Sequence, residues 1–277
     1  MNLKNKKRLI DASIFAVFAA LIVLFSWVPQ IGFIQIPSVS LTIIPVFVLL
    51  SLGVLPWYYT VLLASIFGLN SWLYALAFAT SPIDLAFQNF FVAVPARVFF
   101  GFVAVFIYAI FKKIGEDRIW KKVVLFTLYL IFFGVVYLAL VQLTKTYSLG
   151  MKIFTFALTS VLFLASLILF TLTFKKQTLV IANTVILSQI IYSIMVLGAL
   201  FLYLYIKKLY PPNADKLFLS IISFNTVLET LLSLLICVPI YTVVQFTYKE
   251  QFLNKNKNID EEISDEKWNF FNRYWQH

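Results

Sequence analysis

Long apolar runs separated by short polar clusters dominate the chain and predict a bundle of membrane-spanning helices. The runs lie at residues 9–28, 41–55, 57–79, 86–111, 123–143, 153–174, 178–206 and 217–247. Most reach the roughly 20 apolar residues that a helix needs to cross the hydrocarbon core of a bilayer. The second run is shorter, so we expect its helix to be sheltered inside the bundle. The pattern therefore predicts an all-α integral membrane protein with about eight transmembrane helices.

Composition supports this interpretation and excludes a soluble domain. Of the 277 residues, 62% are hydrophobic and 12% are charged, whereas an ordinary soluble protein is about 45–50% apolar. The first run has no small-residue cleavage site behind it and ends at Trp27-Val28-Pro29. We therefore expect a retained helix and not a signal peptide.

The distribution of positive charge predicts the orientation of the bundle. Most of the 22 Lys and Arg residues lie in the polar segments at residues 1–8, 112–122, 175–176 and 249–277. Few lie in the alternate segments at 145–152 and 207–216. Because short basic segments stay on the cytoplasmic side, both termini are predicted to be cytoplasmic.

The same rule accounts for the net charge of +10, so we expect no nucleic-acid partner. Residues 1–248 then form one transmembrane bundle, and residues 249–277 form a cytoplasmic tail.

The inventory of reactive residues argues against most enzyme chemistry. Cys237 is the single cysteine and His277 is the single histidine. Disulfides, zinc or haem sites and histidine-based catalytic triads need partners that this chain lacks. The sequence also contains no G-x-x-x-x-G-K-[ST] loop for a nucleotide. We therefore expect neither a cofactor nor a catalytic site, and any energy from ATP must enter through another polypeptide.

Small residues form a regular pattern on the first predicted helix. Ala12, Ala16 and Ala20 recur every four residues and so share one face. Such faces allow two helix backbones to approach closely in lipid. The pattern alone is better explained by ordinary packing within the bundle.

Several short motifs follow one another in a family-specific order. They are Thr42 with Ile44-Pro45-Val46, Phe67-Gly68-Leu69-Asn70-Ser71, Ser81-Pro82, Pro95-Ala96-Arg97 with Gly101, Asn183-Thr184, and the stretch at 223–240. Together they resemble the substrate-binding S-components of energy-coupling factor (ECF) vitamin transporters over residues 9–111 and 178–247. S-components have six helices, so residues 118–176 would be an added two-helix hairpin.

The resemblance implies a binding protein without chemistry of its own. It would capture one water-soluble vitamin from outside and dock on a membrane coupling subunit (T-component) with two cytoplasmic ATPases. In that family an Ala-x-x-x-Ala face of the first helix contacts the coupling subunit, which assigns this role to Ala12, Ala16 and Ala20. The vitamin is not specified by the resemblance. Pantothenate is marginally favoured over pyridoxine-type ligands and riboflavin, because an arginine could take its carboxylate.

Two ionisable residues, Arg97 and Glu229, are placed deep within predicted helices. A charge in lipid costs about 2.5–3.5 kcal/mol on insertion scales, so it usually serves a function or a partner. Counted from the predicted outer helix ends, both lie about 17–18 Å deep. They either form a structural ion pair, or Arg97 receives an anionic or polar group of the ligand through its planar donors.

Other polar and aromatic residues at comparable depth complete the predicted ligand site. They are Asn225, Asn70, Ser71, Gln189, Tyr192 and, at the outer mouth, Trp72. Trp27 and Phe33 are weaker candidates for a cap over the pocket, because an interfacial belt explains most aromatic residues. Asp84, Gln88 and Asn89 are either gate residues or a solvated helix entry, and Asn183 is expected to serve in helix packing.

Two other classes of function remain as alternatives. A stand-alone secondary transporter of a small metabolite would be expected to show inverted repeats or broken helices in matching halves. An integral membrane enzyme acting on lipid would need clustered carboxylates or histidines near the interface. Neither pattern is evident in the sequence, so the S-component is the preferred hypothesis.

Overall fold

The computed structural model describes residues 3–28, 32–36, 39–79, 85–114, 178–208 and 229–244, with Thr226 and scattered residues between 127 and 164. Apart from those scattered residues, the helices predicted at 123–143 and 153–174 lie outside the described ranges. The same is true of the tail at 249–277. The bundle outlined below therefore consists of the segments before residue 115 and after residue 177.

Four helices of the described chain are long and apolar enough to cross a membrane. They are α1 (Leu3–Trp27), α4 (Trp57–Phe78), α6 (Phe90–Ile114) and α9 (Thr178–Ile206). Their positions confirm the corresponding apolar runs of the sequence. A shorter apolar helix, Glu229–Val244, follows, and we refer to it as the last helix. The described part of the chain is thus a helical membrane protein with one small β-hairpin.

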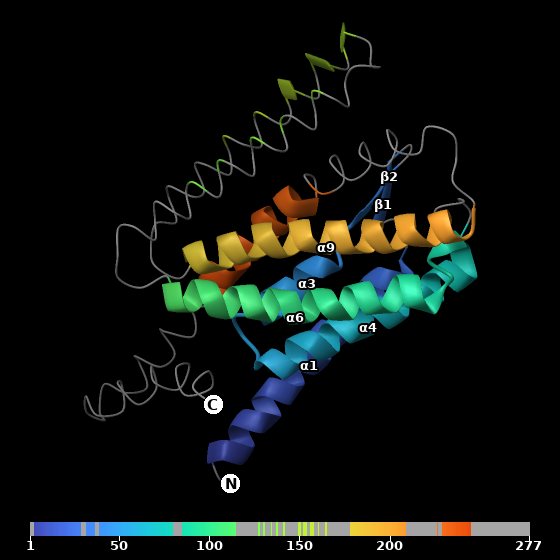
Figure 1. Cartoon of the computed structure of the whole chain (residues 1–277). Helices are drawn as coiled ribbons and strands as arrows, with labels where there is room; N and C mark the ends of the chain where they lie inside the picture. Colours follow the sequence, from blue (N-terminus) through green and yellow to red (C-terminus); the bar gives the residue numbers. More distant parts are fainter. Residues whose placement is uncertain are drawn as a thin grey trace.

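In the bundle, α6 packs against both α4 and α9, and α1 lies along α4. Figure 1 shows α4, α6 and α9 running side by side, with α1 at the edge and its N-terminal end projecting beyond the others. The short helix α3 (Pro45–Ser51) lies behind α6 and α9 in the same view. This arrangement surrounds α3 with longer helices.

The second predicted span differs from the single helix expected at 41–55. Strands β1 (Phe33–Ile36) and β2 (Val39–Thr42) form an antiparallel hairpin in which Ile36 pairs with Val39. The alternation of apolar and polar residues around Pro37-Ser38 favours such a hairpin. Helix α3 then begins at Pro45, because proline at the first helical position lacks only an N–H that would be unsatisfied anyway. The long apolar run was therefore a strand followed by a seven-residue helix.

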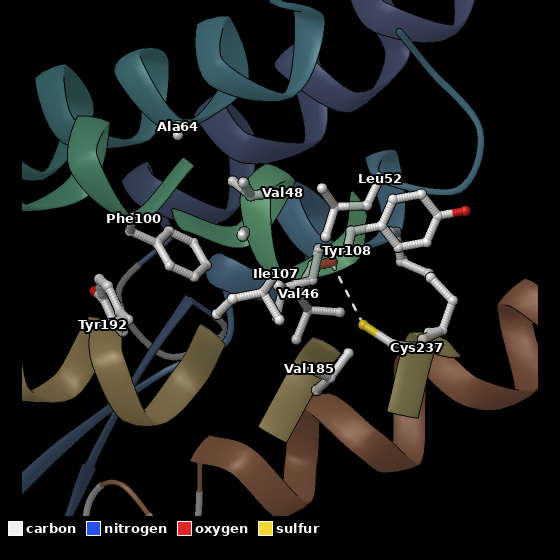
Figure 2. Packing of buried hydrophobic residues seen from close by; sticks show 14 of the residues in the cluster. Val46, Val48, Leu52, Ala64, Phe100, Ile107, Tyr108, Val185, Tyr192 and Cys237 are labelled. Atoms are coloured by element: carbon white, nitrogen blue, oxygen red, sulfur yellow. Dashed lines mark hydrogen bonds between the residues drawn. The ribbon is translucent and has the colours of Figure 1, made fainter. Parts of the chain in front are cut away.

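Helix α3 forms the centre of the hydrophobic core, as expected for a sheltered element. Six of its seven residues are buried. Figure 2 shows Val46 and Val48 of α3 among residues of α4, α6, α9 and the last helix. The thiol of Cys237 donates to the carbonyl oxygen of Val46 at 3.6 Å. In lipid, a helix of this length needs such cover, because its free backbone ends would otherwise face hydrocarbon.

Small residues bring α4 and α6 into close contact. A Cβ added at Gly101 would stand 2.6 Å from Cβ of Ala64 and 3.3 Å from Cα of Val61. One added at Gly68 would stand 3.2 Å from the carbonyl oxygen of Val94. Close approach of this kind replaces the hydrophobic drive that is missing between helices in lipid.

This contact gives a testable prediction for Gly101→Ala. The added methyl group overpacks the interface with Ala64, which typically costs about 1–3 kcal/mol. We expect a lower thermal denaturation midpoint in detergent, measured by fluorescence-detected size exclusion. Adding Ala64→Gly should restore most of the loss.

Gly198→Ala on α9 is the matched control. An added Cβ there meets no atom of the described residues within 4 Å, so the midpoint should not fall. Equal losses in Gly101→Ala and Gly198→Ala would contradict the proposed close contact.

Candidate functional site

The carboxylate of Glu229 lies in the bundle interior, 3% exposed, and connects three segments. Its Oε1 accepts a hydrogen bond from the backbone N–H of Thr42 at 2.9 Å. Its Oε2 accepts one from Nε2 of Gln189 at 3.0 Å. The last helix is thereby joined both to the end of β2 and to the middle of α9.

Arg97 is the cation of the same interior and is 5% exposed. Its Nη1 donates to the carbonyl oxygen of Ala93, one turn earlier, at 2.6 Å. Its Cζ lies 5.2 Å from the ring centroids of both Phe67 and Phe87. The two rings thus flank the guanidinium, an arrangement favoured by cation–π attraction in a desolvated setting.

Tyr192 connects these two charged residues. Its hydroxyl interacts electrostatically with both Arg97 and Glu229. Its ring centroid lies 4.8 Å from that of Phe100 and 6.1 Å from that of Phe67, and Figure 2 shows it facing Phe100. Since Gln189 precedes Tyr192 by three residues on α9, both occupy one face of that helix. Arg97, Gln189, Tyr192 and Glu229, called the polar cluster below, therefore come together, and the two charged residues lie near each other as the sequence suggested.

The polar cluster has hydrogen-bonding capacity to spare. Two of its buried atoms, Nε of Arg97 and Oε1 of Gln189, have no hydrogen-bond partner within the described chain. The same is true of three buried hydroxyls outside the cluster, those of Ser188, Ser193 and Thr226. Leaving a buried polar group unsatisfied costs about 1–3 kcal/mol. Such groups in a native structure call for an explanation, and a bound polar ligand is one.

Asn70 and Trp72 are engaged in contacts between and within segments. Nε1 of Trp27 donates to Oδ1 of Asn70 at 3.1 Å, and Nδ2 of Asn70 donates to the carbonyl oxygen of Ile66 at 2.9 Å. Nε1 of Trp72 donates to the carbonyl oxygen of Gln88 at 2.9 Å. In this conformation Asn70 ties α1 to α4, and Trp72 ties α4 to the turn before α6.

The remaining predicted positions fall in several places. Ser71 and Asn183 are buried. Gln88 donates through Nε2 to the carbonyl oxygen of Ala75 at 3.2 Å, and Oδ1 of Asn89 accepts from the N–H of Phe91 at 2.9 Å. Both side chains therefore form hydrogen bonds at the turn that precedes α6. Asn225 and Asp84 lie outside the described residues, as does the side chain of Phe33.

The number of helical residues counted between the outer helix end and Arg97 was too large. Helix α6 begins at Phe90 and is preceded by a turn at residues 87–89. Arg97 is therefore seven residues, or about 10 Å, from the start of its helix. The error arose because the apolar run at 86–111 includes this turn.

Sequence reasoning missed several members of the site. The backbone N–H of Thr42 carries no residue-type signal, and the flanking rings of Phe67 and Phe87 are hidden among 30 phenylalanines. Thr226 had a usable signal, because it precedes Glu229 by three residues and so shares its helix face.

Ala12, Ala16 and Ala20 are all exposed on α1. Only 11% of the apolar stretch of α1 is buried, against 39% for α4, 56% for α6 and 50% for α9. Packing inside the described bundle therefore does not account for this small-residue face.

No family model matches the sequence, and a search of curated proteins finds no match either. The described residues also contain no group of three or more His, Cys, Asp or Glu side chains that could hold a metal ion.

The polar cluster predicts a specific pattern of stability changes. Arg97→Ala leaves the buried carboxylate of Glu229 without its nearby cation, which should cost about 3–5 kcal/mol unless the acid takes up a proton. Adding Glu229→Gln removes the charge and keeps an acceptor for Thr42. We expect thermal midpoints in detergent to fall in Arg97→Ala and to recover in the double variant.

A double variant as unstable as Arg97→Ala would contradict electrostatic coupling between these two residues. An unchanged midpoint in the single variant would do the same.

Proposed function

We propose that the chain is the substrate-binding subunit (S-component) of an ECF-type ABC importer for a water-soluble vitamin. It resides in the cell membrane as a multi-pass protein with both termini in the cytoplasm. The polar cluster is the observation that carries this proposal. Ionisable residues inside a membrane bundle usually mark a substrate pathway, and this cluster retains unpartnered donors and acceptors.

The energy source follows from what the sequence lacks. Without a nucleotide-binding loop the chain does not hydrolyse ATP itself. Uptake against a gradient then requires two ATPase subunits and a membrane coupling subunit. The order of motifs from Thr42 to residue 240 supports the same assignment.

The exposed alanines on α1 are proposed as the contact with the coupling subunit. Their small side chains allow a helix of another protein to approach closely. The low burial of α1 within the chain supports this role, because most of its surface is left to lipid or to a partner.

A secondary transporter is the second candidate, and one observation favours it. The second span is discontinuous, with β2 ending at Thr42 and α3 beginning at Pro45. Broken helices at the binding site are common in secondary transporters. They occur there in matching halves, and the four long described helices include no second break of this kind.

Reconstitution distinguishes the two candidates. The purified protein alone in vesicles should bind the vitamin and should not accumulate it, with or without a proton or sodium gradient. Addition of the coupling subunit and ATPases with internal ATP should produce accumulation. Gradient-driven accumulation of radiolabelled vitamin by the lone protein would favour the secondary transporter.

A bulky substitution tests the proposed interface. Ala16→Trp should leave binding intact and abolish ATP-driven uptake, because the indole separates α1 from the coupling subunit. Leu202→Trp is the control, since Leu202 is 58% exposed on α9 and its replacement should leave uptake normal. Normal uptake by Ala16→Trp in the assembled complex would remove α1 from the interface.

A further inference from the structure

The contacts within the polar cluster indicate which charge its ligand would carry. Its anion, Glu229, is already engaged. Both carboxylate oxygens accept hydrogen bonds from neutral donors, the N–H of Thr42 and the amide of Gln189. A cationic ligand paired with Glu229 would share the carboxylate oxygens with the contacts that hold β2 and α9, using the acceptor sites that these two bonds leave. It would also lie close to the positive charge of Arg97.

The cation of the cluster is better placed to receive a ligand. The rings of Phe67 and Phe87 flank the guanidinium, and Nη1 is engaged by Ala93. The Nε–H group of Arg97 is buried and has no partner among the described residues. The N–H donors of a guanidinium lie in one plane and point in nearly parallel directions. This arrangement matches the two oxygen atoms of a carboxylate.

Gln189 supplies the complementary acceptor. Amide nitrogen and oxygen are often assigned only from their neighbours. Here the carboxylate of Glu229 requires the nitrogen on its side, which places Oε1 on the other. That oxygen is buried without a hydrogen-bond partner within the described chain. It would accept an N–H or O–H group of a ligand.

Arg97 and Gln189 share Glu229 as a neighbour, because Gln189 donates to its Oε2 and Arg97 acts on it electrostatically. Tyr192 is one turn beyond Gln189 and interacts electrostatically with Arg97. We propose that the ligand is a small molecule that presents one carboxylate to Arg97 and an N–H or O–H donor to Gln189. This ligand is not a cation. The proposal rests on the function proposed above. Hydroxy acids and acyl-amino acids of the pantothenate type have this chemistry.

Binding measurements on the intact protein in detergent test the ligand class. The probes are pantothenate, its alcohol analogue with CH₂OH in place of the carboxylate, riboflavin, and the cation thiamine. Small molecules retained through purification are identified by mass spectrometry. We expect pantothenate to bind at least tenfold more tightly than its alcohol, and we expect any retained molecule to carry a carboxylate.

Two variants separate a loss of ligand binding from a loss of protein stability. Arg97→Gln should weaken pantothenate binding by about ten- to hundredfold and should abolish the preference for pantothenate over the alcohol. Ser51→Ala is the control, because Ser51 is buried on α3 and hydrogen bonded to Thr60 at 2.8 Å. It should keep both affinity and preference even where the denaturation midpoint falls.

The possible failures are distinguishable. Tight binding of thiamine or riboflavin, or a retained molecule without a carboxylate, would overturn the ligand class and leave the binding function standing. A carboxylate preference that persists in Arg97→Gln would overturn the role of Arg97. A folded protein that binds no probe and retains no molecule would overturn the proposed function and the ligand class with it.

Discussion

The buried carboxylate of Glu229 is the contact on which the interior of this bundle depends. A bilayer offers no water to satisfy backbone that leaves helical geometry, and the chain does so between β2 and α3. Glu229 accepts the N–H of Thr42 at that break and binds Gln189 of α9 with its other oxygen. One side chain therefore stabilises the discontinuity and fixes the last helix against α9. These two hydrogen bonds and Arg97 nearby offset part of the cost of burying its charge.

The position of Arg97 depends in turn on the close packing of α4 and α6. A Cβ at Gly68 would stand 3.4 Å from Cβ of Arg97, so the absence of a side chain there lets the two helices approach. This approach brings the guanidinium within 5.2 Å of Phe67 on α4. Phe87, in the turn before α6, flanks it as well, and the hydrogen bonds of Trp72 and Gln88 hold that turn to α4. Gly68, Trp72 and Gln88 lie outside the polar cluster, but their packing and hydrogen bonds help to position Arg97.

Long apolar runs were sufficient to predict α1, α4, α6 and α9, because such runs in a membrane protein have few alternatives to helix. This signal failed between residues 41 and 55, where a buried strand and a buried helix give the same apolar run. The rule that buried charge has a purpose drew attention to Arg97 and Glu229, and the structure places Gln189 beside Glu229 and Tyr192 near both charged residues. Depth carried no information on the contacts of Asn70 and Trp72, since their partners come from other segments and are fixed only by the tertiary structure.

We propose that this chain binds a solute while other polypeptides supply the energy for its transport. Purification of the affinity-tagged protein from native membranes in a mild detergent tests it most directly, with the subunit composition determined by native mass spectrometry. We expect a complex containing one further membrane subunit and two ATP-binding subunits. A protein recovered only as a monomer or as a homo-oligomer, under conditions that keep other membrane complexes intact, would contradict it.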